Sequence, residues 1–265
     1  MNLEIVTITP AMAEQFLSKN TTNRNLNVDR VLFYSIIIGN GNWLLNGESI
    51  KIDKAGNLLD GQHRLSAIIK AGKAIKTVLA TNVDASTFTT IDTGKPRNAA
   101  DCLKIEGVAN STNISGGISK YLAFKNGHKS GSNRVVVKTS NSDILQEYNS
   151  NPLVYQSIYQ NGVAFYNHVY RIITPADYIA FYRYFQLKYH TNVIDSFFEN
   201  ITNKIGVCGL LHDKLMMEKV TKRKLITSEK NAIMIKAFIY HATGKNVKVL
   251  KYQIDEPFPS ILKLK

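Results

Sequence analysis

The N-terminal part of the chain alternates between two hydrophobic patterns. Apolar residues at every second position predict short strands, whereas apolar residues three and four apart predict amphipathic helices. The predicted strands cover residues 3–8, 49–53, 58–59 and 75–81, and the predicted helices start at Pro10, run from Asn27 or Val28 to Gly39, and run from Gly61 to Ala71. Turn residues 53–57 join two of the strands, so we expect a hairpin over residues 49–59.

Beyond residue 97 the strand pattern gives way to helical periodicity. Helices are predicted over residues 97–105, 111–125, 143–149, 152–166, 174–189, 193–202 and 227–243. The helix that begins at Thr174 carries an aromatic stripe that we interpret as core, formed by Tyr178, Phe181, Tyr182, Phe185 and Tyr189. Residues 127–132 are polar and predict an exposed loop. The pattern therefore predicts an α+β fold, with an α/β domain over residues 1–105 and a mostly helical domain over residues 106–265.

The composition is that of a folded, water-exposed protein, with 265 residues of which 44% are hydrophobic and 20% charged. The most apolar run, residues 31–38, is far shorter than the roughly 20 residues of a bilayer span, and the N-terminal residues show no secretory pattern. Cys102 and Cys208 stand alone, without a zinc-ligand spacing, so we expect reduced thiols. These observations predict a cytoplasmic protein with no membrane partner.

The charge balance indicates a polyanionic partner. Lys and Arg exceed Asp and Glu by 33 to 20, for a net charge of +13. The excess is +5 over residues 1–130, zero over 131–200 and +8 over 201–265. Its densest point comprises Lys219, Lys222, Arg223 and Lys224, which we interpret as nucleic-acid-binding residues, with DNA the expected partner. The alternative is a solvated basic helix end.

One short motif, Asp60-Gly61-Gln62-His63-Arg64, places polar chemistry at a predicted strand-to-helix junction. Asp60 stands where a helix N-cap belongs, and Gly61 lets another group approach the backbone closely. The first-turn amides and the helix dipole favour an anion, and Arg64 can donate two hydrogen bonds to a phosphate. His63 can exchange a proton near neutral pH. The alternative is that Asp60 only caps the helix while His63 and Arg64 pack against a neighbouring loop.

A second cationic turn follows at residues 92–97, Asp-Thr-Gly-Lys-Pro-Arg. Lys95 and Arg97 could close over the same phosphate from the other side, although the spacing is not that of a P-loop. A solvated turn that caps a helix is the alternative. Trp43 precedes the hairpin, and we interpret it as a core residue rather than a stacking wall for a ligand.

Three stretches resemble DGQHR-type members of the ParB/sulfiredoxin superfamily, which occur in phages and mobile elements. They are Trp43–Glu48 with Leu58–Ala67, then Ile91–Asp101, then Glu256–Pro259. The resemblance covers residues 1–105 and implies a ParB/sulfiredoxin-like α/β domain there. It also implies that Gly61 and Arg64 bind nucleotide phosphates. The catalytic cysteine of sulfiredoxin falls on Gln62, so the sulfinic-acid reductase reaction is not expected.

Together these features predict a nucleotide-binding, phosphate-binding protein that acts on or near DNA. Gly61, Gln62, Arg64, Lys95 and Arg97 are the predicted nucleotide contacts. A further hypothesis is that the protein hydrolyses a nucleoside triphosphate with magnesium. The same motif would then supply the catalytic residues Asp60, His63 and Arg64.

Two alternatives stay open. One is a non-catalytic DNA-binding accessory protein or regulator, whose nucleotide pocket is only structural. The other is a metal-dependent ParB-like nuclease, which is less favoured because the chain has no dense carboxylate cluster. The metal ligands stay unknown, with Asp60 and His63 as candidates to position a metal, and a homo-oligomer stays open.

Overall fold

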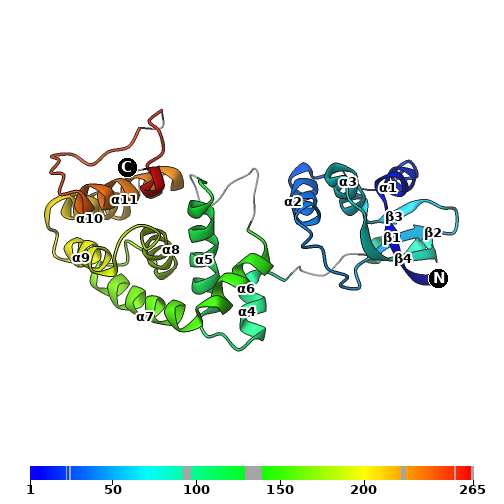
Figure 1. The fold of residues 1–265 in the computed structure, drawn as a ribbon, viewed down its shortest axis with the longest axis horizontal. Coiled ribbons are helices and arrows are strands. Elements are labelled where there is room, and N and C mark those ends of the chain that lie inside the picture. Colours follow the sequence, from blue (N-terminus) through cyan, green and yellow to red (C-terminus); the bar gives the residue numbers. More distant parts are fainter. Residues whose placement is uncertain are drawn as a thin grey trace. The chain divides into compact units, whose positions relative to one another are not determined.

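The computed structural model describes residues 1–21, 23, 25–91, 97–128, 139–221, 225–253 and 255–263. They form two compact units, the N-terminal unit (described over residues 1–91) and the helical unit (described within 97–263) (Figure 1). The fold is therefore α+β, with a mixed sheet in the N-terminal unit and a helical C-terminal part. The units divide between residues 96 and 97, whereas the sequence placed the boundary after residue 105. The difference arises because α4 (Ala99–Ile105) buries Ala99 and Leu103 in the core of the helical unit.

The N-terminal unit contains the strands and helices that the sequence predicts, plus one short 3₁₀ helix. Its elements are β1 (Asn2–Ile8), α1 (Pro10–Leu17), α2 (Val28–Gly39), β2 (Ser49–Asp53), β3 (Leu58–Asp60), α3 (Gln62–Ala71), β4 (Ile75–Val83) and η1 (Ala85–Thr90). The strand order is β1-β4-β2-β3. The central pair, β2 and β4, is parallel, and each of these strands pairs antiparallel with an edge strand.

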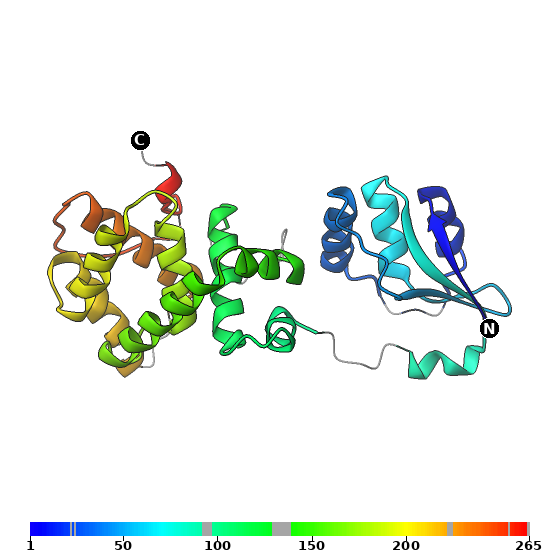
Figure 2. The same cartoon turned by 60° about the horizontal axis from the view of Figure 1, so that its bottom comes forward.

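The two faces of this sheet have different coverings (Figure 2). Helices α1, α2 and α3 cover one face, where alternate strand residues such as Ile8, Ile50 and Leu79 pack with Leu65 and Ile68 of α3. On the other face, Leu59, Ala80 and Val83 form a small buried cluster, and Ile91, the residue after η1, packs against it. The sheet therefore has one closed face and one partly open face.

Local hydrogen bonds explain why the elements begin and turn where they do. The Thr9 hydroxyl accepts from the Met12 amide at the start of α1, and the Asn27 side chain accepts from the Arg30 amide at the start of α2. In the β2–β3 turn the Asn57 side chain and backbone both donate to the Asp53 carboxylate, and these bonds lower the pKa of Asp53. The predicted hairpin is thus confirmed, together with the chemistry of its turn.

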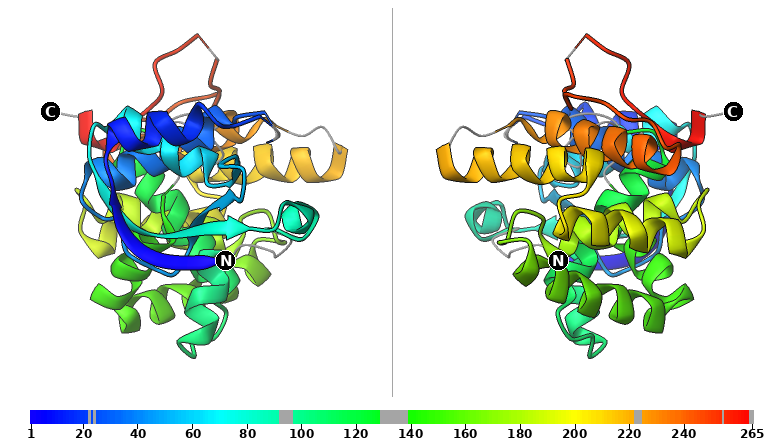
Figure 3. Two further views of the ribbon diagram at one scale, coloured as in Figure 1. Left: turned by 90° about the vertical axis from the view of Figure 1, so that its right-hand side faces the viewer. Right: turned by 90° about the vertical axis from the view of Figure 1, so that its left-hand side faces the viewer.

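The helical unit consists of eight α-helices and a final 3₁₀ turn among its described residues. They are α4, α5 (Ser111–Lys125), α6 (Asn141–Ser150), α7 (Pro152–His168), α8 (Pro175–Phe185), α9 (Thr191–Thr202), α10 (Gly206–Thr221), α11 (Thr227–Ala242) and η2 (Ile261–Lys263). The seven predicted helices are confirmed, and α10 is the one that the periodicity did not predict. Figure 3 shows α10 and α11 side by side at the end of this unit.

Aromatic side chains fill the core of the helical unit. Tyr178, Phe181, Tyr182 and Phe185 of α8 are buried, as the stripe predicts, and the Phe185 ring stacks on Phe238 with 3.6 Å between centroids. Tyr189 lies beyond the end of α8 and is only partly buried, because that helix ends at Phe185. The stripe is therefore core, not a platform for stacking bases.

A partly buried ion pair joins α5 to α8. The Lys120 Nζ donates to the Asp177 Oδ1 at 2.6 Å, and the Asp177 backbone amide donates to the Thr174 hydroxyl. Burial by itself raises the pKa of Asp177, but the Lys120 ammonium and the hydrogen bonds outweigh burial, so the pKa lies below its ordinary value. The ionised carboxylate is therefore part of the folded state.

This pair predicts a loss of stability in acid. Because the folded-state pKa of Asp177 is depressed, the contribution is present above its unfolded pKa, near 4, and is lost as the pH falls through the folded value. Urea unfolding followed by far-UV circular dichroism, which reports mainly the helical unit, measures it. Asp177→Asn is expected to lower the unfolding free energy by about 2 kcal/mol at pH 7 and to flatten the decline below pH 5. Parallel pH profiles for the two proteins would contradict this account.

Candidate functional site

The β3–α3 junction is built around a glycine that no other residue can replace without strain. Gly61 has φ 109°, a conformation that L side chains rarely adopt, and a Cβ there would lie 3.0 Å from Cγ1 of Ile50 on β2. Gly61 is also the N-cap residue of α3, which has no side-chain cap hydrogen bond there. The prediction that Asp60 caps this helix is therefore wrong, because Asp60 is the last residue of β3 and its carboxylate is bound elsewhere.

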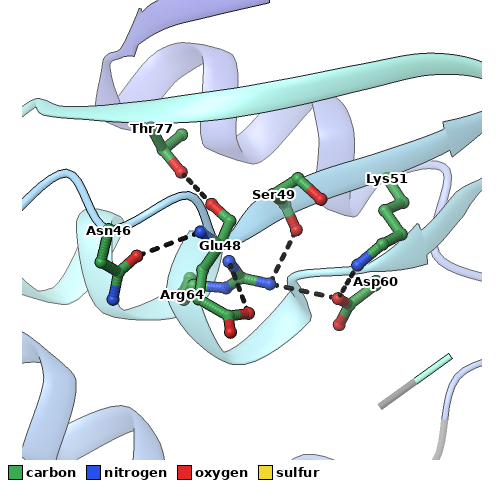
Figure 4. Close-up of polar contacts among 7 residues, drawn as sticks. All are labelled: Asn46, Glu48, Ser49, Lys51, Asp60, Arg64 and Thr77. Carbon is green, nitrogen blue, oxygen red and sulfur yellow. Dashed lines mark hydrogen bonds and ion pairs between the residues drawn. The ribbon is translucent and has the colours of Figure 1, made fainter. Parts of the chain in front are cut away.

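The Arg64 guanidinium is the centre of the site (Figure 4). Its Nη2 donates to the Ser49 carbonyl at 2.8 Å and to the Asp60 Oδ2 at 3.2 Å. The same Asp60 oxygen accepts from the Lys51 Nζ at 2.9 Å. Arg64 is only 8% exposed, so one buried cation ties β2, β3 and α3 together.

The second terminal nitrogen of Arg64 has no such partner. Nη1 is buried, and within the described residues no atom accepts a hydrogen bond from it. The closest carboxylate oxygen is the Glu48 Oε2, at 3.9 Å, which is too long for a hydrogen bond. A buried donor without an acceptor costs roughly 1–3 kcal/mol, and more when it is charged. An anionic ligand oxygen would remove this cost.

The charges around Arg64 balance each other. The cations are Lys51 and Arg64, and the carboxylates are Asp60 and Glu48. Asp60 is held by both cations, whereas the Glu48 side chain is 68% exposed and approaches only Nη1. Access of an anion to Arg64 therefore depends on Glu48, since its carboxylate can turn into solvent without breaking a hydrogen bond of the cluster.

Gln62 and His63 bind the connection between α1 and α2. The Gln62 Oε1 accepts from the Asn20 side chain at 3.1 Å, and the His63 Nε2 accepts from the Asn27 backbone N–H at 3.0 Å. Both side chains are buried. Because Nε2 is an acceptor, the proton of a neutral His63 is on Nδ1. The structure thus gives both side chains a positioning role, and the catalytic roles of Asp60 and His63 stay predictions.

A cavity of about 440 Å³ adjoins this cluster on the partly open face of the sheet. Leu3, Ala80 and Val83 form part of its apolar wall, and Ser49 and Lys51 line its polar side. Ser49 and Lys51 also belong to the Arg64 cluster, so strand β2 contributes residues both to the cavity and to the contacts of the guanidinium. The sequence offered a signal for Lys51, because hairpin pairing places it opposite Asp60.

The remaining predicted site residues belong to the helical unit or are outside the described residues. Lys95 is outside the described residues, and Arg97 is exposed in the helical unit, where its carbonyl accepts from the Asn141 side chain. Lys219 lies in the last turn of α10 in the same unit, whereas Lys222, Arg223 and Lys224 are outside the described residues. A shared phosphate site for Arg64, Lys95 and Arg97 therefore stays a prediction. Trp43 is partly buried and meets the Tyr34 ring edge-on at 5.8 Å, in keeping with a packing role.

Cys208 and His241 are the other pair whose chemistry could matter. The Cys208 Sγ lies 3.8 Å from the His241 Nδ1. Burial raises the pKa of Cys208 to about 12 and lowers the pKa of His241. At neutral pH the thiol is therefore protonated and the imidazole neutral, so this pair is not an activated nucleophile.

The described residues contain no group of three or more His, Cys, Asp or Glu side chains that could hold a metal ion. None of the helices they form is long and apolar enough to cross a membrane. Comparisons with protein-family models, curated proteins and solved structures find no match to this chain. The likeness to the ParB/sulfiredoxin superfamily thus rests on the motifs quoted above and stays a prediction.

The junction predicts an unequal response to two glycine substitutions. Gly61→Ala introduces both an unfavourable φ and a contact with Ile50, whereas Gly72→Ala at the end of α3 introduces only the unfavourable φ of 63°. Trp43 is the only tryptophan, so its fluorescence reports unfolding of the N-terminal unit. In urea, Gly72→Ala is expected to cost about 1 kcal/mol and Gly61→Ala about 3 kcal/mol. Equal costs would show that the approach of Ile50 is unimportant.

Proposed function

We propose that the N-terminal unit binds a phosphate-bearing small molecule, a nucleotide, at the β3–α3 junction. The observation that carries this proposal is the buried Nη1 of Arg64, which has no hydrogen-bond acceptor among the described residues. A guanidinium that is held through Nη2 and lacks an acceptor at Nη1 is preorganised for one more anionic oxygen.

Three features of the junction support a phosphate in that place. The N-terminal end of α3 carries the positive end of the helix dipole, and its N-cap residue, Gly61, has no side chain that could cap it. The positive φ of Gly61 lets the chain turn directly from β3 into α3, so this helix end follows Asp60 without an intervening loop. The Lys51 ammonium supplies a second positive charge beside the Arg64 guanidinium. A phosphate that replaces the Glu48 carboxylate would satisfy Nη1 without disturbing Asp60.

The adjoining cavity supports a nucleotide rather than free phosphate. Its volume of about 440 Å³ lies within the range of small-molecule sites, roughly 300–1,000 Å³. Apolar residues of β1 and β4 line one side of it, which suits the flat face of a base, whereas Lys51 lines the side nearest the phosphate position.

The proposed activity is binding without hydrolysis. Asp60 is held by Lys51 and Arg64, and the His63 Nε2 accepts a backbone hydrogen bond, so neither group is placed to activate water. The described residues of the junction form no group of three or more His, Cys, Asp or Glu side chains that could hold a metal ion. Action on or near DNA is supported by the excess of +8 over residues 201–265.

Glu48 and Arg64 predict opposite changes in nucleotide affinity. Calorimetry with each ribonucleoside triphosphate and with inorganic phosphate measures them. Arg64→Lys removes the planar donor and is expected to weaken binding by about 10- to 100-fold. Glu48→Gln removes a carboxylate that competes for Nη1 and is expected to tighten binding by about three- to tenfold.

The exposed side chain of Glu48 makes this test independent of folding. Glu14→Gln on α1, also exposed, is the matched control and should leave the affinity unchanged. Trp43 fluorescence in urea verifies that each variant is folded. The proposal is overturned if the wild-type protein binds none of the phosphates, or if Glu48→Gln binds no more tightly than Glu14→Gln.

A further inference from the structure

The loop between α7 and α8 exposes an aromatic and basic corner on the helical unit. Val169, Ile172 and Ile173 of this loop are buried and fix it to the core. Between them, Tyr170 is 62% exposed and Arg171 is also exposed. We call Tyr170 and Arg171, together with Lys219, the Tyr170 corner.

The backbone of this corner is unusual for the residues it carries. Tyr170 and Arg171 have φ values of 52° and 63°, so two consecutive residues with large side chains adopt the left-handed conformation. The Arg171 N–H donates to the Tyr166 carbonyl, which ends α7 in the way that glycine usually allows. Glycine would adopt these two conformations without strain. The residues present instead, Tyr170 and Arg171, have unfavourable φ values but place two large side chains on the surface.

Within the part of the chain that the structure describes, neither Arg171 nor Lys219 forms an ion pair with an acid. The Lys219 Nζ donates to the Tyr170 carbonyl at 2.5 Å, and the Arg171 guanidinium lies 5.8 Å from the centroid of the Tyr166 ring. Both contacts leave the positive charge uncompensated. The sequence has no acid between Glu147 and Asp177, whereas Glu218, next to Lys219, forms an ion pair with Lys230.

We propose that the Tyr170 corner binds single-stranded nucleic acid. An exposed tyrosine flanked by cations matches the two requirements of such a site, a ring on which an unpaired base can stack and positive charge for the backbone. A duplex satisfies only the second, because its base faces are already stacked inside the helix.

The proposal is independent of the phosphate site at Arg64. That site lies in the N-terminal unit and concerns a small molecule, whereas the Tyr170 corner belongs to the helical unit. Failure of nucleotide binding therefore leaves this proposal intact, and the reverse holds as well.

Glycine substitutions test the corner without threatening the fold. Tyr170→Gly and Arg171→Gly each remove a side chain and relieve a left-handed residue, so each is expected to raise the melting temperature by about 2 °C. The matched controls are Asn110→Gly and Lys204→Gly, which relieve the same conformation at φ 58° and 56° elsewhere in the helical unit. The pairs match in charge as well, since Tyr170 and Asn110 are neutral and Arg171 and Lys204 are cations.

Fluorescence anisotropy of the full chain with labelled oligonucleotides of about 20 residues measures binding. The probes are oligothymidylate, oligouridylate and a DNA duplex of the same length, and the first two distinguish DNA from RNA. The wild-type protein is expected to bind single strands more tightly than the duplex. Tyr170→Gly is expected to weaken single-strand binding by about tenfold, and Arg171→Gly to weaken it and to reduce its dependence on salt, while both controls bind within about twofold of wild type.

Each other outcome counts against the proposal. Equal affinity for single strands and duplex, or an unchanged affinity of Tyr170→Gly, would overturn it, as would no binding by the wild-type protein. Binding to phosphatidylserine vesicles that Tyr170→Gly abolishes, without binding to single strands, would make the corner a membrane contact instead.

Discussion

The N-terminal unit depends on one buried cation. The Arg64 side chain leaves the first turn of α3, crosses to the Ser49 carbonyl of β2 and meets the Asp60 carboxylate at the end of β3. A buried guanidinium is costly unless its donors are satisfied, and Nη2 is satisfied twice while Nη1 has no acceptor within the described residues. The side chain that fixes the strand-helix junction thus also leaves a buried donor to which we propose that an anion binds. Arg64 therefore has two roles, since it holds the junction together and carries the proposed anion site.

Local patterns predicted most of the elements, because the information that fixes them lies within a few residues. The β2–β3 hairpin and the Gly72 end of α3 are examples, as is the buried stripe of α8. The hydrophobic periodicity did not predict α10, and the reason is its glycine content. It begins with Gly206 and Gly209, which are weak helix formers, and Gly209 is required because a Cβ there would lie 2.4 Å from the Lys204 carbonyl oxygen. The 3₁₀ helix η1 was missed because its sequence ASTFTT, in which only Ala85 and Phe88 are apolar, has no hydrophobic period.

The sequence predicted where the candidate site lies but not the hydrogen-bond partners of its side chains. The motif placed Gly61 and Arg64 correctly at a strand-helix junction, yet it assigned Asp60 to a helix cap. The partners of Asp60 and Arg64 include Lys51, Ser49 and Glu48, and they are set by the pairing of β2 with β3 rather than by neighbours in the motif. Likewise, the Tyr170 corner depends on a contact between Lys219 and a loop that precedes it by 49 positions. Such contacts follow from tertiary packing, which no short window of sequence contains.

Arginine side-chain ¹⁵N NMR can observe Nη1 of Arg64, the nitrogen that has no hydrogen-bond acceptor among the described residues, and so can test directly whether an anion binds there. The Arg64 guanidinium signals are assigned by their loss in Arg64→Lys, and the protein is titrated with a nucleoside triphosphate. If a phosphate oxygen binds to Nη1, the Arg64 Nη signals shift in a saturable way as the nucleotide is added. Those of Arg183, whose guanidinium already binds Glu147 and Tyr155, should stay in place. Arg64 signals that do not move, or that move only as Arg183 moves, would contradict the assignment of an anion site to this junction.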